Sequence, residues 1–322
     1  MMKAYKSPAL AYGFLLLAAA AAGCARTELR APGPDFHPVR APSLFRVTLD
    51  GIVNADYRDG KPLTAWNSTA AIIERTLAAW YPSLTIRPRL ADPSPEEVAR
   101  GLSNLPGPDA ADLAIVYLAS RQSAAGEWEF TRGGGLVSWG RLLAASQPPV
   151  HPGRLVILDA CNAEAAMRFP EWRSRLAPAC LLAGAADELT YDLDFYSRRP
   201  VDFEKRFPRA AAWLKANMPP AWDGKMSFLG FIWLQAYLRT ERAPTTAADW
   251  AAFFRTCEEE SRTFRARHAA GISSTVHGYA AEGQGAPNIR GNTVVFVILS
   301  GAKNLAVGIA TADSSPPEGG SE

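Results

Sequence analysis

The chain has 322 residues, and 48% of them are hydrophobic, which is enough to build one large domain or two small ones around a real core. This composition excludes a disordered or collagen-like chain. The 34 basic residues nearly balance the 32 acidic ones, and the formal charge of +2 provides no field that would draw the chain onto nucleic acid. We therefore exclude nucleic acid as a partner.

Residues 1–23 have the pattern of an export signal. Lys3 and Lys6 form a short basic region, and residues 9–22 are an apolar stretch that is too short for a permanent membrane-spanning helix. The stretch ends in Ala-Ala-Gly-Cys at residues 21–24, which resembles a bacterial lipobox with Ala21 in the place where leucine is usual. The pattern predicts that the signal is removed and that Cys24 carries lipid. Ordinary secretory cleavage is the alternative.

A lipid on Cys24 would fix both the tether and the location of the protein. Residues 24–43 are rich in proline and arginine and show no helix or strand periodicity, which predicts a flexible tether between lipid and domain. Without the signal, 32 basic residues face 32 acidic ones, so the membrane anchor would be the lipid and not electrostatic attraction. We expect a lipid-anchored protein of the cell envelope. Ala25 is compatible with an outer membrane, facing the periplasm.

Residues 44–300 alternate between strand and helix patterns. Leu113–Ala119 and Leu155–Ala160 are near-continuous apolar runs, typical of central parallel strands covered on both faces. Ser94 and Glu97 form a capping box that predicts a helix start. Further strands are expected at 44–52, 84–90, 180–183 and 292–299, and further helices from Asn67 to residue 80, at 227–240 and at 246–268. The pattern predicts an α/β domain with a mostly parallel sheet flanked by helices on both faces. For residues 301–322 we predict a disordered tail.

Sites in such folds gather at the carboxyl ends of the strands. Arg121 and Gln122 follow the third predicted strand, and Cys161 follows the fourth. A cysteine just past a buried strand can be exposed as a reactive thiolate, and a small buried thiol is the alternative. The cysteines form no CxxC pair, the four histidines have no metal-binding spacing, and there is no phosphate loop or dinucleotide fingerprint, so we expect no metal and no cofactor.

The segment 156–162 reads Val-Ile-Leu-Asp-Ala-Cys-Asn and is similar to the nucleophile segment of caspase and metacaspase-like cysteine peptidases. The segment 112–120 resembles the strand that leads into the catalytic histidine of that family. Residues 51–57, 126–130 and 182–188 resemble its first strand and loop, its short hairpin, and the strand after the cysteine. The resemblance covers roughly residues 44–300 and implies a caspase-like fold with Cys161 at the nucleophile position.

The resemblance also assigns roles to three further residues. Arg121 stands where the family has its histidine, and a guanidinium cannot accept the thiol proton, although its charge can lower the pKa of Cys161. The backbone amides of Cys161 and Gln122 would form the oxyanion hole, with Gln122 where the family has a small residue. Asp159 would bind a basic side chain of the substrate; the alternative is that it only hydrogen-bonds nearby backbone amides.

These features predict a lipid-anchored caspase-like domain that is a pseudopeptidase and binds a peptide or protein without efficient cleavage. One alternative is an active cysteine endopeptidase that uses Cys161 with a displaced base. His151 precedes the fourth strand and is expected at the opposite end of the sheet, whereas His268 and His277 fall at a helix end and in a loop late in the chain. A second alternative is a structural envelope lipoprotein.

Overall fold

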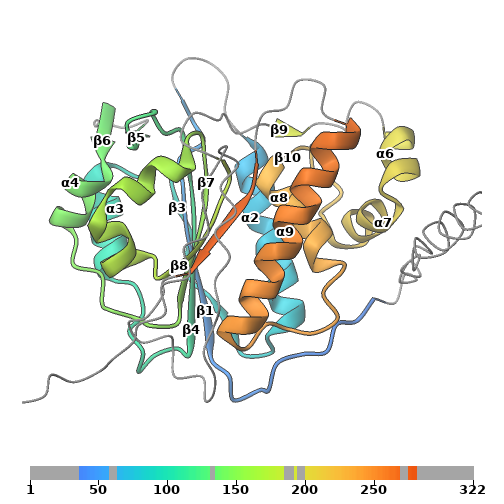
Figure 1. Cartoon of the computed structure of the whole chain (residues 1–322), viewed down its shortest axis with the longest axis horizontal. Helices are drawn as coiled ribbons and strands as arrows, with labels where there is room; N and C mark the ends of the chain where they lie inside the picture. Colours follow the sequence, from blue (N-terminus) through green and yellow to red (C-terminus); the bar gives the residue numbers. More distant parts are fainter. Residues whose placement is uncertain are drawn as a thin grey trace, which may run out of the picture.

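Three layers make up the computed structural model, which describes residues 36–57, 64–130, 135–184, 192–193, 200–268 and 275–280. A central sheet lies between two layers of helices (Figure 1). The sheet contains β1 (Val47–Val53), β2 (Leu84–Ile86), β3 (Leu90–Ala91), β4 (Leu113–Ser120), β7 (Arg154–Ala160), β8 (Ala179–Leu182) and β11 (His277–Ala280). The helices are α2 (Thr64–Trp80), α3 (Pro95–Ser103), α4 (Trp139–Ala145), α6 (Pro200–Arg206), α7 (Pro208–Asn217), α8 (Phe228–Tyr237) and α9 (Ala247–His268). Two small antiparallel pairs complete the described part, β5 (Glu127–Phe130) with β6 (Gly135–Ser138) and β9 (Asp192–Leu193) with β10 (Met226–Ser227).

The strands of the central sheet run in the order β11-β8-β7-β4-β1-β2, and β3 also pairs with β1. Every pairing is parallel except that of β11 with β8. All residues of β4 and β7 are buried, because helices cover both faces of these central strands. The predicted α/β architecture with a mostly parallel, helix-flanked sheet is confirmed. We call the end at which β1, β4, β7 and β8 finish, at the top of Figure 1, the carboxyl edge.

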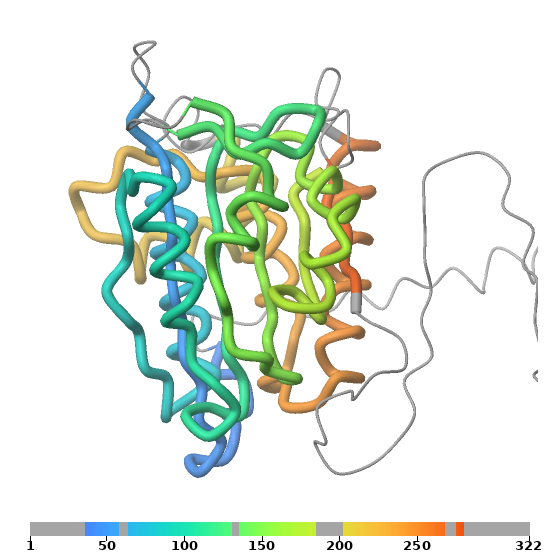
Figure 2. The backbone as a smooth tube through the Cα atoms, turned by 90° about the vertical axis from the view of Figure 1, so that its left-hand side faces the viewer, coloured from blue at the N-terminus to red at the C-terminus, as the bar shows by residue number. Residues whose placement is uncertain are grey.

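Helices α2, α8 and α9 cover one face of the sheet, and α6 and α7 lie outside them (Figure 1). Helices α3 and α4 cover the other face, which Figure 2 shows from the front. A short 3-10 segment, Ala163–Arg168, and a π-type turn, Trp172–Leu176, follow β7. Helix α8 is buried along nearly its whole length, so it forms the centre of its layer.

Several predicted elements are found with small shifts at their ends. The capping box at α3 is present with both of its hydrogen bonds, between Ser94 and Glu97. The predicted helices at 227–240 and 246–268 correspond to α8 and α9, and Ser227 caps α8 by accepting from the Gly230 amide. The expected strand at 180–183 is β8.

Two predicted elements differ from the structure. Helix α2 begins at Thr64 and not after an Asn67 cap, because Ala65 and Trp66 are themselves fully buried and extend its packed face by a turn. The predicted strand at 84–90 is divided into β2 and β3 around Pro88, which has no N–H for a ladder hydrogen bond. The two arginines beside Pro88 form ion pairs elsewhere, Arg87 with Asp50 at 3.0 Å and Arg89 with Glu74.

Three helices were not predicted, and most of the predictions for the two ends of the chain concern residues outside the described ranges. Helices α4, α6 and α7 were not predicted, and the expected strand at 292–299 and the tail lie outside the described residues, as do residues 1–35. Residues 36–43, which the sequence assigns to the tether, contact the domain: Val39 pairs with Arg242, and the Ala41 amide donates to the Trp80 carbonyl at 2.9 Å. The described chain therefore begins at a segment held against α2 and α8.

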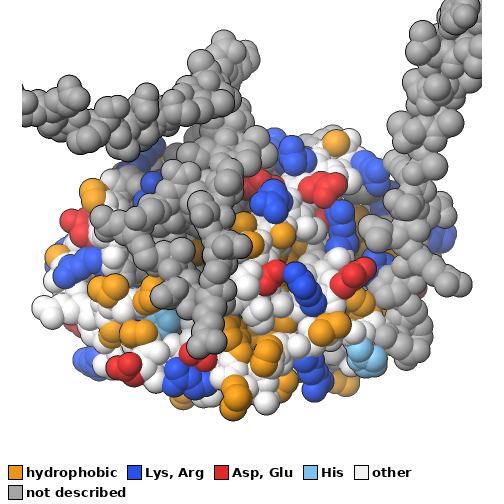
Figure 3. Space-filling model, turned by 60° about the horizontal axis from the view of Figure 1, so that its bottom comes forward, with side chains coloured by type: hydrophobic (Ala, Val, Ile, Leu, Met, Phe, Trp, Pro, Cys, Tyr) orange, Lys and Arg blue, Asp and Glu red, His pale blue; other side chains and the backbone are white. Residues whose placement is uncertain are grey.

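The loops at the amino ends of the strands carry a mixed surface. Leu44 and Val150, which precede β1 and β7, are 88% and 72% exposed. Figure 3 views the molecule from this side and shows basic and acidic side chains interspersed with hydrophobic ones. No helix in the described ranges combines the length and the apolar character needed to cross a membrane.

Asp50 of β1 and Arg154 of β7 carry opposite charges on the strands that flank β4, and Asp50 is partly buried. Arg154 is 1% exposed, and its guanidinium donates to the carbonyls of Pro106 and Arg175, both at 3.2 Å. Asp50 forms an ion pair with Arg87. Burial raises the pKa of the Asp50 carboxyl to about 6, and this effect outweighs the positive charges of Arg87 and Arg154, which lower the pKa. Burial likewise lowers the pKa of Arg154, to about 10. The Asp50 charge is therefore a cost to folding at neutral pH.

We expect Asp50→Asn to become more stable relative to the wild type as pH rises from about 4 to 7. The folded-state pKa of Asp50 lies above its unfolded value, so the folded protein binds the extra proton in this window and the wild type loses stability as pH rises. A difference of about two pKa units corresponds to about 3 kcal/mol. Chemical unfolding across this pH range measures the effect, and parallel stability curves for the two proteins would contradict it.

Asp112→Asn is the matched control. Hydrogen bonds and charge from Arg46 hold the pKa of the Asp112 carboxyl below its usual range. Its ionised form therefore stabilises the folded state above the unfolded pKa, and that contribution is lost as pH falls. The difference between the control variant and the wild type should have the opposite sign and should shrink in acid.

Candidate functional site at the carboxyl edge

The strand ends that carry the predicted site residues lie side by side. In the β4–β7 pairing, Ala119 is opposite Asp159 and Ser120 is opposite Ala160. Arg121 and Cys161 are the next residues of the two strands, so both stand at the carboxyl edge directly beyond the last paired residues. The structure thus brings together the two segments that the sequence singled out.

Cys161 is the accessible cysteine of the described chain. Its residue is partly exposed, whereas Cys180 and Cys257 are buried, and all three are free thiols. Burial raises the pKa of the Cys180 thiol to about 12, and it also raises the pKa of Cys257 well above its usual value. Only Cys161 combines access with a position at the carboxyl edge.

Arg121 is held by Tyr57, which follows β1. The guanidinium carbon lies 4.3 Å from the centroid of the Tyr57 ring, a cation–π contact, and the Arg121 amide donates to the Tyr57 hydroxyl at 2.7 Å. That hydroxyl also lies 3.0 Å from the hydroxyl of Ser120, and burial raises the pKa of Tyr57, which keeps the phenol protonated. The contacts fix a permanent positive charge at the strand end next to Cys161.

Gln122 and Asn162 form a reciprocal clamp between the two strand ends. The Gln122 side chain donates to the Asn162 carbonyl at 2.8 Å, and the Asn162 side chain donates to the Gln122 carbonyl at 2.9 Å. The indole N–H of Trp139 donates to the Gln122 side-chain oxygen at 2.9 Å, so this buried amide is fully engaged. Asn162 has a φ of 51°, a left-handed conformation that asparagine tolerates better than most residues. The clamp fixes the backbone on both sides of Cys161.

The backbone amide of Gln122 is directed away from the β5–β6 hairpin. The hairpin bonds to the neighbours of Gln122, through the Arg121 carbonyl and the Ser123 amide, both at 2.9 Å. The N–H and C=O of Gln122 therefore point to the side of β7, and its C=O accepts from Asn162. Its N–H has no acceptor among the residues that the structure describes. The amide therefore points towards the end of β7, and Gln122 as a residue is only 5% exposed.

Asp159 is enclosed between β7 and the start of α8. The residue is fully buried, and one carboxylate oxygen accepts from the Tyr117 hydroxyl at 3.0 Å and from the Ser227 hydroxyl at 2.5 Å. Ser227 is the residue that caps α8. These contacts, with two hydroxyl groups among the partners of the carboxylate, favour a structural role for Asp159.

His151 lies at the far end of the sheet from Cys161, as predicted. Its Nδ1 accepts from the Gly153 amide at 3.0 Å, which leaves Nε2 to donate to the Ala111 carbonyl at 3.1 Å. The loop that holds it precedes β7, whose two ends lie about 20 Å apart. Burial lowers the pKa of His151, so it is a neutral structural histidine.

The two late histidines differ in their relation to the site. His277 lies in β11 and not in a loop. Two residues later, the Tyr279 hydroxyl donates to the Glu164 carboxylate, on the face of the sheet opposite to Ser227. Residues two apart in a strand share a face, so the His277 side chain is on that same opposite face. His268 is the last residue of α9, and this end of α9 lies at the level of the carboxyl edge (Figure 1).

Comparison with known proteins finds no family model and no curated protein that matches this sequence. The described residues also contain no cluster of three or more side chains suited to hold a metal ion. The chemistry of the site therefore has to be argued from its own geometry.

Sequence reasoning found the strand ends but missed what holds them. It did not assign a role to Tyr57, Asn162, Trp139 or Ser227. Polar residues directly after buried strands are a general signal of a site, and Asn162 carried that signal. Nothing in the local pattern connects Ser227 with Asp159, since 68 residues separate them.

We expect a mild alkylating reagent to label Cys161 alone in the folded protein with Cys24 replaced by serine. The thiols of Cys180 and Cys257 are buried and have raised pKa values, so they react only after local opening. Peptide mapping by mass spectrometry gives the labelled positions. Labelling of Cys180 or Cys257 at a comparable rate would show that this part of the core opens readily.

We expect Gln122→Ala to destabilise the fold by about 2 kcal/mol, because it leaves the buried Trp139 indole without its acceptor and removes one of the two donors to the Asn162 carbonyl, the other being the Ala165 amide. Gln147→Ala, an exposed glutamine, is the matched control and should change stability little. Denaturant unfolding monitors both. Equal stability of the two variants would mean that the clamp does not hold the strand ends.

Proposed function

We propose that the chain is a lipid-anchored protein whose caspase-like domain binds an extended peptide or protein segment at the carboxyl edge without efficient cleavage. The observation that carries the proposal is the parallel placement of Arg121 beyond β4 and Cys161 beyond β7, the two positions at which a cysteine peptidase needs a base and a nucleophile. The site has the nucleophile position and a cation in place of the base.

A fixed guanidinium changes which steps such a site can perform. Positive charge near a thiol stabilises the thiolate, so Arg121 favours a nucleophilic Cys161. Peptide hydrolysis also requires a group that takes the thiol proton and then gives a proton to the leaving amine, and a guanidinium can do neither. The arrangement therefore supports engagement of a carbonyl more than its hydrolysis.

Peptide capture has a physical basis in the same residues. The Gln122 N–H points to the side of β7 without an acceptor among the described residues, so it can donate to a main-chain carbonyl of a bound segment. The Gln122–Asn162 clamp keeps the donor in a fixed position, which reduces the entropy lost on binding.

An active endopeptidase is the second candidate, and the position of α9 favours it. The carboxyl end of α9 lies at the level of the carboxyl edge (Figure 1), and the helix ends at His268, the residue that would have to supply the displaced base.

The lipid anchor on Cys24 and the location in the cell envelope are part of the proposal. Both depend on residues 1–35, which lie outside the described part of the chain.

Arg121→His tests the proposal directly. If the rest of the site is intact, the variant should hydrolyse peptides at arginine or lysine about 100-fold faster than the wild type, since a positioned general base contributes rate increases of this order. Arg121→Gln is the matched control and should not gain activity. A fluorogenic peptide assay measures the rates. Equal rates for Arg121→His and Arg121→Gln would show that more than the base has been lost. If the wild type cleaves efficiently and His268→Ala abolishes that cleavage, the second candidate is favoured.

Cys161→Ala separates binding from chemistry. Under the proposal, the variant should bind a labelled arginine-containing peptide with an affinity within about twofold of the wild type, because the main-chain donors remain in place. Fluorescence anisotropy gives the affinity. A large loss of binding would mean that the complex depends on a covalent bond to the sulfur and would count against a binding role.

A further inference from the structure

Residues 36–46 form a strap that is bound to the domain at the amino ends of the strands. The amide and the carbonyl of Val39 bond to the loop that follows α8, both at 2.8 Å. The Ala41 amide donates to the carbonyl of Trp80, the last residue of α2. Figure 1 shows the strap running along the bottom of the molecule into β1, at the end of the sheet opposite to the carboxyl edge.

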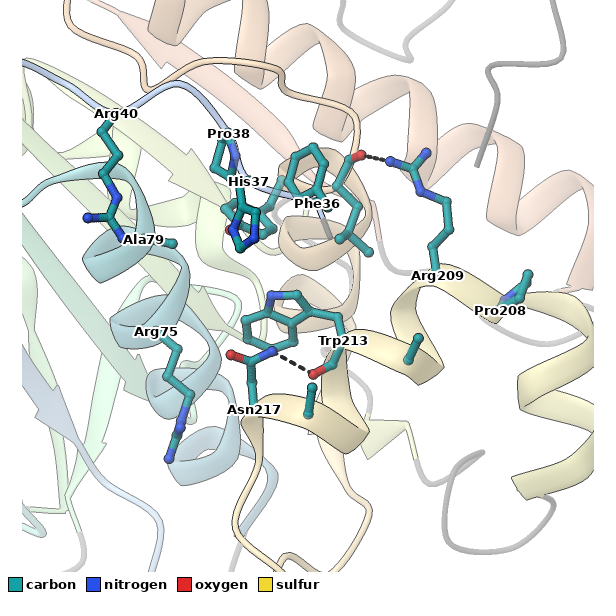
Figure 4. A pocket seen from close by; sticks show the side chains of 14 residues that line it. Phe36, His37, Pro38, Arg40, Arg75, Ala79, Pro208, Arg209, Trp213 and Asn217 are labelled. Carbon is teal, nitrogen blue, oxygen red and sulfur yellow. Dashed lines mark hydrogen bonds between the residues drawn. The ribbon is translucent and has the colours of Figure 1, made fainter. Parts of the chain in front are cut away.

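The strap is built into the domain from its first residue. A cavity of about 410 Å³ lies where the strap begins, on the outer side of the helix layer, with walls from residues 36–40, α2, α7 and the end of α8 (Figure 4). The Phe36 ring meets the Tyr237 ring edge to face with centroids 5.5 Å apart, and the guanidinium carbon of Arg209 lies 6.0 Å from the Phe36 centroid. The chain therefore enters the domain at a fixed point.

The three most exposed large hydrophobic side chains of the described chain lie on the strap or at the same end of the sheet. Leu44 is 88% exposed, Val150 is 72% exposed and Val39 is 67% exposed. Leu44 and Val39 belong to the strap, and Val150 lies in the loop before β7. We call the side of the molecule that carries these three residues the strap face. Exposed aliphatic side chains gathered at one end of a fold indicate a surface that meets an apolar phase or partner.

The sheet places Leu44 and Val150 at a common level. Val47 is opposite Leu113, and the β4–β7 register continues this row to residue 153. Leu44 and Val150 each precede this row by three residues, on the two strands that flank β4. Both side chains thus stand beyond the amino end of the sheet, where one flat surface can meet them.

Charges on the strap face are largely paired. Arg46 of the strap forms an ion pair with Asp112 at 3.0 Å, and Arg242, whose backbone pairs with the strap, forms one with Asp249 at 3.2 Å. Figure 3 views this side and shows hydrophobic side chains among basic and acidic ones. The strap face therefore offers aliphatic contacts without a strong field of either sign, which suits a bilayer surface whatever the charge of its headgroups.

The lipid anchor of the proposed function brings a bilayer to this face. Phe36 lies twelve residues after Cys24, so even an extended chain keeps the start of the strap within about 40 Å of the lipid. Contact between the strap face and the same bilayer is then an intramolecular event with a high effective concentration. Two side chains that would bind a membrane weakly alone can therefore hold an anchored domain in one orientation.

We propose that the strap face rests on the bilayer that holds the lipid of Cys24, with Leu44 and Val150 inserted among the headgroups. The inference rests on the lipid anchor of the proposed function. The eight residues of β4 separate this face from the carboxyl edge by about 25 Å. The candidate site then faces away from the membrane and stays open to a peptide or protein in the aqueous phase.

The test uses the full lipidated chain in phosphatidylcholine vesicles, with Cys161→Ala so that a thiol-reactive fluorophore labels one introduced cysteine. The labelled positions are Leu44→Cys, Val150→Cys and the matched control Leu136→Cys, a 52% exposed residue of β6 at the carboxyl edge. Spin-labelled lipids quench fluorophores that touch the bilayer. Labels at Leu44→Cys and Val150→Cys should lose most of their emission, and the label at Leu136→Cys should keep it, because the sheet holds that label about 25 Å farther away.

A second substitution tests whether the aliphatic side chains make the contact. Leu44→Asp in the labelled Val150→Cys protein should reduce the quenching at least about twofold, because a carboxylate is costly in the apolar part of the interface. Leu136→Asp is the matched control and should leave the quenching unchanged. Both positions are exposed, so neither substitution disturbs the core. Equal quenching in the two variants would count against the proposal.

The outcomes separate this inference from the proposals on which it rests. If the protein floats with the vesicles and all three labels are quenched equally, the orientation is overturned and the anchor stands. A chain that carries no lipid on Cys24 and does not float overturns both. Peptide affinity is measured separately by fluorescence anisotropy, and its absence would count against the carboxyl-edge proposal alone.

Discussion

Because β4 and β7 pair in parallel and are covered on both faces, their carboxyl ends must finish side by side, and the site depends on this constraint. A shift of one residue in the pairing would turn Asp159 away from Tyr117 and Ser227 and separate the Gln122–Asn162 clamp. The register is itself fixed by burial, since the two strands carry no exposed face that could tolerate such a slip. Core packing thus decides which residues meet at the surface.

The sequence was sufficient for the elements whose signals are local. The apolar runs predicted β4 and β7, and the Ser94–Glu97 capping box predicted the start of α3. The predicted parallel topology was enough to place Arg121 and Cys161 close together at the carboxyl edge, and the β4–β7 pairing has them there. Where local chemistry and global topology agree, sequence reasoning works well.

The remaining features depend on contacts between distant parts of the chain. The role of Asp159 depends on Ser227, and the cation–π contact of Arg121 depends on Tyr57, which lies 64 residues away along the chain. The start of α2 was misplaced because Asn67 is a good cap in isolation, whereas Trp66 is buried only in the folded protein. The cavity between residues 36–40, α2, α7 and the end of α8 was not predicted, since its lining residues come from four separate segments without a shared motif.

Helix α8 runs from the carboxyl edge to the cavity on the outer side of the helix layer. Its first turn is capped by Ser227, which bonds the carboxylate of Asp159 two residues before Cys161, and its last residue, Tyr237, lines that cavity. A buried helix of ten residues shifts as one rigid rod of about 15 Å, so its ends cannot move independently. A ligand that displaced one end of α8 would therefore displace the other, and linkage would make the resulting change in affinity equal in both directions.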